Sequence, residues 1–85
     1  RYPAVPLAYQ VLAAGGDAGA VLNAVDEVAT AAFLAGRIPF PSIVQLSERV
    51  LAEHRVGPID SIAAVLAADA QARRAANTLL AAYPA

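Results

Sequence analysis

A pair of glycines followed by a long apolar stretch constrains this chain more than any other feature. Gly15 and Gly16 end a run of apolar residues at helical spacing, and glycine readily takes the left-handed conformation that closes a helix. From about Ala18 to Ala35, apolar residues cover most of the helical wheel, and the polar ones lie within about 100° of arc. We therefore expect this segment to be the central helix of a bundle. Its polar stripe consists of Asn23, Asp26, Glu27 and Thr30.

Helix-ending residues flank this segment on both sides. An earlier helix is predicted to start at about Pro6, where the missing N–H of proline costs nothing. Asp17 is expected to cap the central helix by accepting hydrogen bonds from its unpaired N–H groups. Gly36 is expected to end it.

A third helix is predicted after a short link in which Pro39 and Pro41 flank Phe40 and keep the chain extended. Ser42 is expected to start this helix, because Gln45 follows three residues later in a capping-box pattern. Its inner face is expected to consist of Ile43, Leu46, Val50 and Leu51.

A last helix is predicted beyond the break at Gly57-Pro58. Asp60 or Ser61 is expected to cap it, and it should run to about Ala82, before Pro84. No strand pattern competes with these elements. The predicted fold class is therefore all-α, a small bundle of four helices with short connections.

The composition limits which partners the chain can have. Its 85 residues make one small domain, and only 15% are charged where about a quarter is usual, so apolar surface is left over for a partner. A net charge of −1 gives no basic footprint for nucleic acid. The longest uncharged run, 2–16, is broken by prolines and predicts no membrane span. The absence of cysteine fits a reducing cytoplasm, and the absence of methionine suggests a piece of a longer polypeptide.

The polar stripe of the central helix has two interpretations. It can be simply the side of the helix that faces solvent. Alternatively, Asn23 and Glu27, which lie one turn apart, hydrogen-bond to a neighbouring segment. Asp26 and Glu27 point about 100° apart on a helix, which is unsuitable for a metal site.

A second polar pair lies on the apolar face of the last helix. Asp69 and Arg73 are four residues apart in the order that favours an ion pair, and desolvated charges must find partners. Arg73 could also reach the acidic stripe of the central helix. A structural pair, a solvated pair and a binding role all remain open at this stage.

No arrangement of residues in this sequence predicts chemistry. His54 is the only histidine, no cysteine or second histidine could share a metal with it, and no serine has a spacing that implies activation. We interpret His54 as a hydrogen-bonded or solvated residue. We therefore predict no catalytic, cofactor-binding or metal-binding residue.

Several segments taken in order resemble the C-terminal domain of the 1-deoxy-D-xylulose 5-phosphate reductoisomerase family. That domain opens with roughly G-G, A-V-L-N-A-A-N-E-V-A-V, A-F-L and I-x-F, which matches Gly15-Gly16 and residues 20–29, 32–34 and 37–40. Residues 65–73 resemble its closing helix, with Asp69 followed by Arg73. Two positions depart from the pattern, because Val25 replaces the usual Ala and Asp26 the usual Asn.

The resemblance implies a fold of four packed helices within a bacterial, cytoplasmic oxidoreductase that forms a homodimer. The full enzyme converts 1-deoxy-D-xylulose 5-phosphate to 2-C-methyl-D-erythritol 4-phosphate for non-mevalonate isoprenoid biosynthesis, using NADPH and a divalent metal, Mg or Mn. The NADPH motif of the family lies in an N-terminal domain and its metal ligands in a middle catalytic domain, and both are missing from residues 1–85. The resemblance thus implies a structural domain that packs against the catalytic domain of the same polypeptide. The alternative is an autonomous helical module that binds another protein without catalysis.

Overall fold

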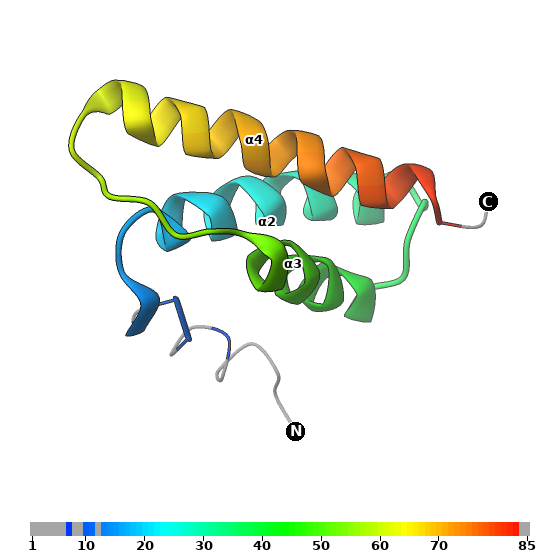
Figure 1. Ribbon diagram of the computed structural model, residues 1–85. Coiled ribbons are helices and arrows are strands. Elements are labelled where there is room, and N and C mark those ends of the chain that lie inside the picture. Colours follow the sequence, from blue (N-terminus) through cyan, green and yellow to red (C-terminus); the bar gives the residue numbers. More distant parts are fainter. Residues whose placement is uncertain (1–6, 8–9, 12, 84–85) are drawn as a thin grey trace.

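The computed structural model describes residues 7, 10–11 and 13–83, and within them it contains three helices and no strand (Figure 1). These are α2 (Ala18–Leu34), α3 (Pro41–Glu53) and α4 (Ile62–Ala81). The all-α class is confirmed. The first predicted helix falls partly on residues outside the described ones, as do Pro6 and Pro84, so a count of four helices is not established. The described residues of that stretch have helical backbone: Leu7, Gln10, Val11, Ala13 and Ala14.

Helix α2 occupies the central position expected for it. It packs against both α3 and α4, which contact each other less extensively. Helices α2 and α4 run in the same general direction and α3 runs in the opposite one (Figure 1). Four residues of α2 are completely inaccessible to solvent, namely Val21, Ala24, Val25 and Ala29.

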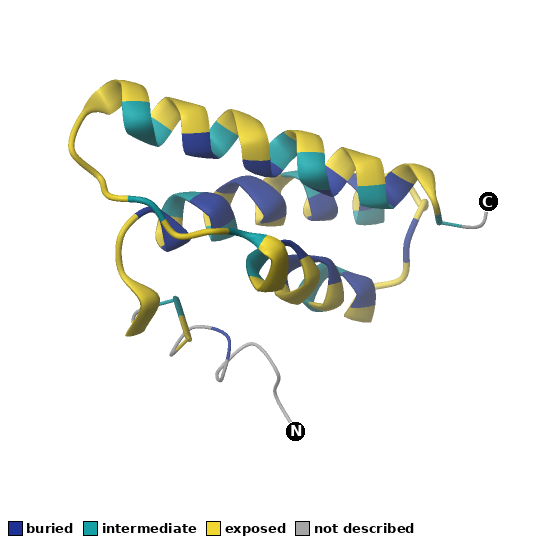
Figure 2. Ribbon diagram, in the orientation of Figure 1, coloured by how far each residue is buried: buried dark blue, intermediate teal, exposed yellow. Residues whose placement is uncertain are grey.

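The core lies where the three helices meet, and buried positions face inward on each of them (Figure 2). In α4 the buried residues recur every fourth position, and three of the four are alanine, so the backbones of α4 and α2 can approach closely. Helix α3 contributes Leu46 and Val50, with Ile43 and Leu51 partly buried against the core, which confirms its predicted inner face. The buried cluster comprises Val21, Ala24, Val25, Ala29, Ala32, Ile38, Leu46, Val50, Ala68, Ala72, Ala76 and Leu80.

Most of the predicted helix ends are confirmed to within one or two residues. Gly15, Gly16 and Gly36 have φ values of 64°, 51° and 77°, in the left-handed region that glycine favours. At the start of α4, the backbone N–H of Ala64 donates to the Ser61 hydroxyl at 3.0 Å, so Ser61 is the cap rather than Asp60.

The predicted start of α3 is wrong. The helix begins at Pro41, one residue before Ser42, and no side chain caps it. Phe40 has φ −53° and ψ −46°, so the link is already helical there and not extended. Proline explains the difference, because its fixed φ suits the first helical position and it has no N–H to be capped. Ser42 is instead a buried residue of the first turn of α3.

Candidate functional site

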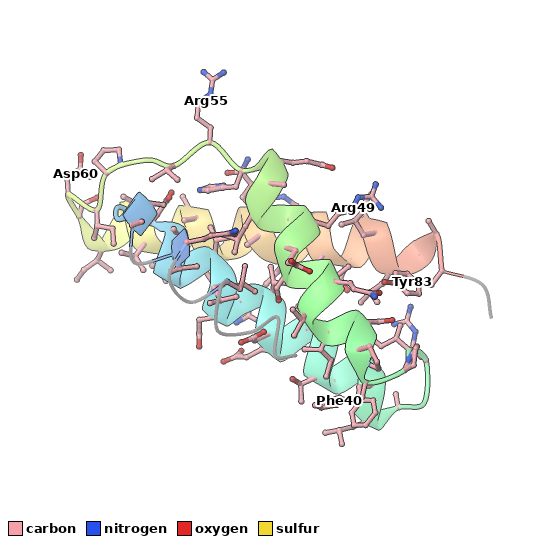
Figure 3. The ribbon with its side chains drawn as sticks, turned by 90° about the horizontal axis from the view of Figure 1, so that it is seen from below. Phe40, Arg49, Arg55, Asp60 and Tyr83 are labelled. Atoms are coloured by element: carbon pink, nitrogen blue, oxygen red, sulfur yellow. The ribbon has the colours of Figure 1, made fainter. Side chains whose placement is uncertain are left out.

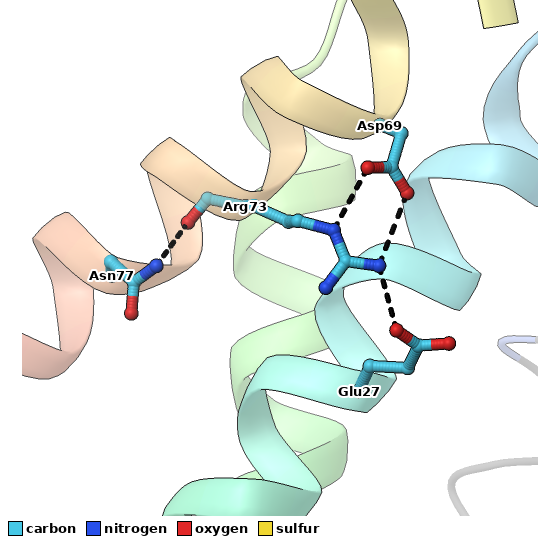
Figure 4. Close-up of polar contacts among 4 residues, drawn as sticks. All are labelled: Glu27, Asp69, Arg73 and Asn77. Atoms are coloured by element: carbon cyan, nitrogen blue, oxygen red, sulfur yellow. Dashed lines mark hydrogen bonds and ion pairs between the residues drawn. The ribbon is translucent and has the colours of Figure 1, made fainter. Parts of the chain in front are cut away.

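Arg73 of α4 joins two carboxylates from different helices (Figure 4). Its Nε donates to Oδ2 of Asp69 at 2.8 Å, and its Nη2 donates to Oδ1 of Asp69 at 3.3 Å and to Oε1 of Glu27 in α2 at 2.7 Å. The carbonyl oxygen of Arg73 also accepts from Nδ2 of Asn77, at 3.0 Å. We call Glu27, Asp69 and Arg73 the Arg73 cluster. It places the expected ion pair at the rim of the α2–α4 interface.

The electrostatics of the Arg73 cluster suit a permanent ion pair. The hydrogen bond from Arg73 holds the pKa of Asp69 below its usual value despite partial desolvation. The hydrogen bonds to Asp69 and then to Glu27 raise the pKa of Arg73 above its already high value. The side chains of Glu27 and Arg73 are 59% and 37% exposed. The cluster therefore connects two helices at the surface, and the shifts of Asp69 and Arg73 both favour the charged form of the pair.

The structure places the remaining stripe residues at the surface. Asn23 and Thr30 are exposed, and neither side chain forms a hydrogen bond within the part of the chain that the structure describes. Of the two residues in the hydrogen-bonding interpretation, only Glu27 contacts a neighbouring helix there. Asp26 is also exposed, and its Oδ1 accepts from the hydroxyl of Ser47 in α3, at 3.2 Å. The Ser47 side chain is completely buried and lies 3.1 Å from the Ile43 carbonyl oxygen, a second acceptor.

A second polar cluster, which the sequence analysis missed, joins the start of α2 to the segment after α3. Nε2 of His54 lies 2.8 Å from Oδ1 of Asp17, and the Gly57 N–H donates to the same oxygen at 3.0 Å. The Asp17 N–H donates in return to the Gly57 carbonyl oxygen at 3.0 Å. The side chains of His54 and Asp17 are only 9% and 12% exposed. We call Asp17, His54 and Gly57 the Asp17 cluster.

The Asp17 carboxylate is kept ionised by these contacts. Burial raises its pKa, but the hydrogen bonds from His54 and Gly57 outweigh it and leave the pKa below the usual value. His54 therefore donates from Nε2 to a carboxylate. The predicted capping role of Asp17 is wrong, since its side chain makes no capping bond to α2. Contacts 37 and 40 residues away compete successfully for its oxygen, and no local pattern reveals them.

Comparison with known proteins identifies the family. A family model described as "DXP reductoisomerase C-terminal domain" matches residues 1–75. The chain belongs to this family. It is 52% identical over 80 residues to the 1-deoxy-D-xylulose 5-phosphate reductoisomerase of Dechloromonas aromatica, covering 94% of this chain and 20% of that protein. For the enzymes of the same name from Ralstonia nicotianae and Cupriavidus necator, the identities are 51% and 47%, covering 96% and 100% of this chain but 21% and 22% of those proteins.

The chain thus spans about a fifth of the length of the curated relatives that it matches. Within its described residues, no group of three or more His, Cys, Asp or Glu side chains could hold a metal. Among the side chains that the structure describes, the clustered donors do not fit a divalent cation, because His54 is paired with a single carboxylate and Arg73 occupies two others. No helix in the described part of the chain is long and apolar enough to cross a membrane.

Neither cluster is arranged for catalysis. In nucleophilic catalysis a base such as histidine lies within hydrogen-bonding reach of the hydroxyl or thiol that it activates. His54 has no such neighbour, because among the described residues its side chain bonds only to the Asp17 carboxylate. In the Arg73 cluster the only nitrogen group is a guanidinium, which does not lose its proton in proteins. Both clusters instead join elements that are distant in sequence, and both involve α2.

Proposed function

We propose that residues 1–85 form the C-terminal helical domain of a 1-deoxy-D-xylulose 5-phosphate reductoisomerase, and that the domain supports the catalytic domain of the same polypeptide by packing. The observation that carries this proposal is the match to the C-terminal family model over residues 1–75. The helical backbone at Gln10–Val11 and Ala13–Ala14 supports a fourth helix in the bundle.

The whole enzyme would convert 1-deoxy-D-xylulose 5-phosphate to 2-C-methyl-D-erythritol 4-phosphate in bacterial isoprenoid precursor biosynthesis. We propose that the other domains hold NADPH and the divalent metal, Mg or Mn, and that the full-length protein is a cytoplasmic homodimer. The donor set described above supports this division of labour, since this domain offers no cluster of metal ligands among its described residues. The family match favours this function over an autonomous interaction module.

The polar clusters support a rigid role for the domain. Glu27 is bonded to Arg73 of α4, and Asp17, which precedes α2, is bonded to His54 at the end of α3, so both neighbours of α2 are connected to it through a carboxylate. The part-buried Asp17–His54 bond contributes more to fixing the relative position of these elements than the exposed Glu27–Arg73 bond does. A domain held in one arrangement presents a constant surface to the rest of the enzyme.

A chimeric enzyme tests the proposal. This chain would replace the 80 matching residues in the reductoisomerase of Dechloromonas aromatica, and NADPH oxidation would be followed with 1-deoxy-D-xylulose 5-phosphate and Mg²⁺. We expect turnover within about tenfold of the parent enzyme, because about half of the replaced residues are identical and the catalytic domains are unchanged.

Two controls sharpen the result. A parent enzyme that lacks the matching segment should lose activity, and the 85-residue chain alone should not oxidise NADPH. Saturable NADPH oxidation by the chain alone, or a folded chimera without turnover, would contradict the proposal.

A further inference from the structure

One face of α4 carries a regular series of residues that packs against α2 for only part of its length. The series is spaced alternately by four and three residues, which keeps it on one side of a helix. Its members are Ile62, Leu66, Asp69, Arg73, Ala76 and Leu80. The second half of this face is in the interface, since Ala76 is fully buried and Leu80 is 3% exposed. In the middle, Arg73 reaches Glu27 of α2.

The first half of the same face has no cover among the described residues. Ile62 is 80% exposed and Leu66 is 63% exposed, although both are large aliphatic residues. In Figure 1 the first turn of α4 lies further out than the start of α2. Figure 2 shows this end of α4 as largely exposed. Ile62 and Leu66 are therefore exposed apolar side chains at the end of α4 that extends past the start of α2, beside the turn at which Ala68 is already buried.

The segment that leads into α4 is fixed in place by the Asp17 cluster. Gly57 exchanges two hydrogen bonds with Asp17, at 3.0 Å each, and Ile59 follows two residues later with 55% exposure. Residues on a held segment lose little conformational freedom when they bind. We define Ile59, Ile62 and Leu66 as the α4 patch.

A second exposed apolar site lies at the other end of the bundle, and it differs in that one of its side chains already has an aromatic partner. Leu34 and Phe40 are 77% and 67% exposed, yet the Phe40 ring packs edge-on against Phe33, with ring centroids 5.5 Å apart. Figure 3 shows Phe40 at the opposite end of the molecule from Asp60, which lies two residues before the start of α4. The α4 patch has no equivalent partner among the described residues.

We propose that the α4 patch is the docking surface for the remainder of the reductoisomerase polypeptide, whose apolar side chains continue the α2–α4 interface over the first turns of α4. This inference rests on the proposed function, in which a chain about five times as long contains this domain. A stable interface between two separate proteins takes about 800 Å² from each partner, and three aliphatic side chains offer only a fraction of it. A partner on the same polypeptide needs to bury far less surface, because it loses no translational entropy of association.

Cysteine probes in the chimera described above test this surface. The chain has no cysteine of its own, so Leu66→Cys introduces a single reporter, and alkylation is read by mass spectrometry of the peptide that carries it. Arg74→Cys is the matched control, because Arg74 is also exposed and lies two turns further along α4. The reference rate for each variant is that of the same chimera unfolded in guanidinium. Ile62→Cys serves as a second reporter if Leu66→Cys lowers the yield of folded protein.

We expect the native chimera to alkylate Leu66→Cys at least about tenfold more slowly than the unfolded one, and Arg74→Cys at nearly the unfolded rate. An active chimera with fast alkylation at both positions overturns the inference and leaves the proposed function intact. Slow alkylation at both positions also overturns it, because the covered surface would then not be confined to the patch. Protection that increases with protein concentration means that a second copy is the occupant, which contradicts the inference. An inactive chimera removes the proposed function and this inference with it.

Discussion

Replacing Asp17 by alanine should destabilise the domain much more than replacing an exposed aspartate. The Asp17 carboxylate accepts from His54 at 2.8 Å and from the Gly57 N–H at 3.0 Å, and its side chain is 12% exposed. Each hydrogen bond to a charged group contributes about 1.5–3 kcal/mol, and water can partly replace the carboxylate at this shallow depth. We therefore expect a loss of about 2–3 kcal/mol, which lowers the melting temperature of a domain of this size by roughly 10–20 °C.

The effect of Asp17→Ala should depend on pH in a defined direction. The pKa of Asp17 is lower in the folded state than its ordinary value, so the folded state binds the proton less well than the unfolded state. Its contribution to stability is therefore fully present above the unfolded pKa of about 3.9 and is lost as the pH falls through the lower folded value. The difference in unfolding free energy between the wild-type chain and the variant should shrink below about pH 4.

A double-mutant cycle separates the Asp17–His54 contact from other consequences of the change. The wild-type chain, Asp17→Ala, His54→Ala and the double variant would be unfolded in urea at pH 7 and followed by circular dichroism. We expect a coupling of about 1–2 kcal/mol, because the two side chains share one short hydrogen bond. Asp60→Ala is the control, since Asp60 is exposed in the same linker and should change stability by less than about 0.5 kcal/mol.

Two results would refute the reasoning. One is a loss for Asp17→Ala no larger than that for Asp60→Ala, which would mean that the buried contacts add nothing net. The other is a difference that grows as the pH falls below about 4, since that requires a raised folded pKa.

Three further experiments test the packing around α2 by thermal unfolding. Gly16→Ala should lower the melting temperature more than Gly15→Ala. Both glycines have positive φ, but only at Gly16 would an added Cβ clash with the linker after α3. Equal decreases in melting temperature for the two variants would contradict this. Val25→Ala should lower the free energy of unfolding by about 2 kcal/mol, because the completely buried side chain loses about two methylene equivalents and leaves a cavity. A decrease below about 0.5 kcal/mol would show that the core collapses to fill the cavity. Arg73→Ala should destabilise the domain less than Asp17→Ala does. The loss of stability should be smaller in high salt, because the Arg73 cluster is half exposed and salt screens its charges. A loss that does not change with salt would argue against an ion pair.

Local sequence rules predicted the helices well because each depends on residues close together in the chain. The positive φ of Gly16, the end of α2 before Gly36 and the Ser61 cap of α4 all follow from such rules. The contact between Arg73 and the polar stripe of α2 could also be predicted from the sequence, because helical spacing places Arg73 on the side of α4 that packs against other helices. Those rules failed where two of them competed, as at Pro41 and Ser42.

The Asp17 cluster could not be predicted in the same way. Its members come from the end of one helix and the beginning of another, and their pairing depends on how α3 turns back along α2. A lone histidine at the end of a helix and an aspartate at the start of another are individually ordinary. Only the packing of α2 between its neighbours brings His54 within 2.8 Å of Asp17.

Position 26 shows how a departure from the family pattern can be neutral inside the domain. The resemblance to the family pattern leads us to expect asparagine at position 26, where this chain has Asp26. A carboxylate accepts hydrogen bonds, whereas an amide also donates them. Within the described residues the side chain at position 26 serves as a hydrogen-bond acceptor, because the Ser47 hydroxyl donates to Oδ1 of Asp26. An asparagine would satisfy Ser47 equally well through its own Oδ1. We therefore expect the donor that Asp26 lacks to matter for contacts on the exposed side of α2 and not for the packing of α2 against α3.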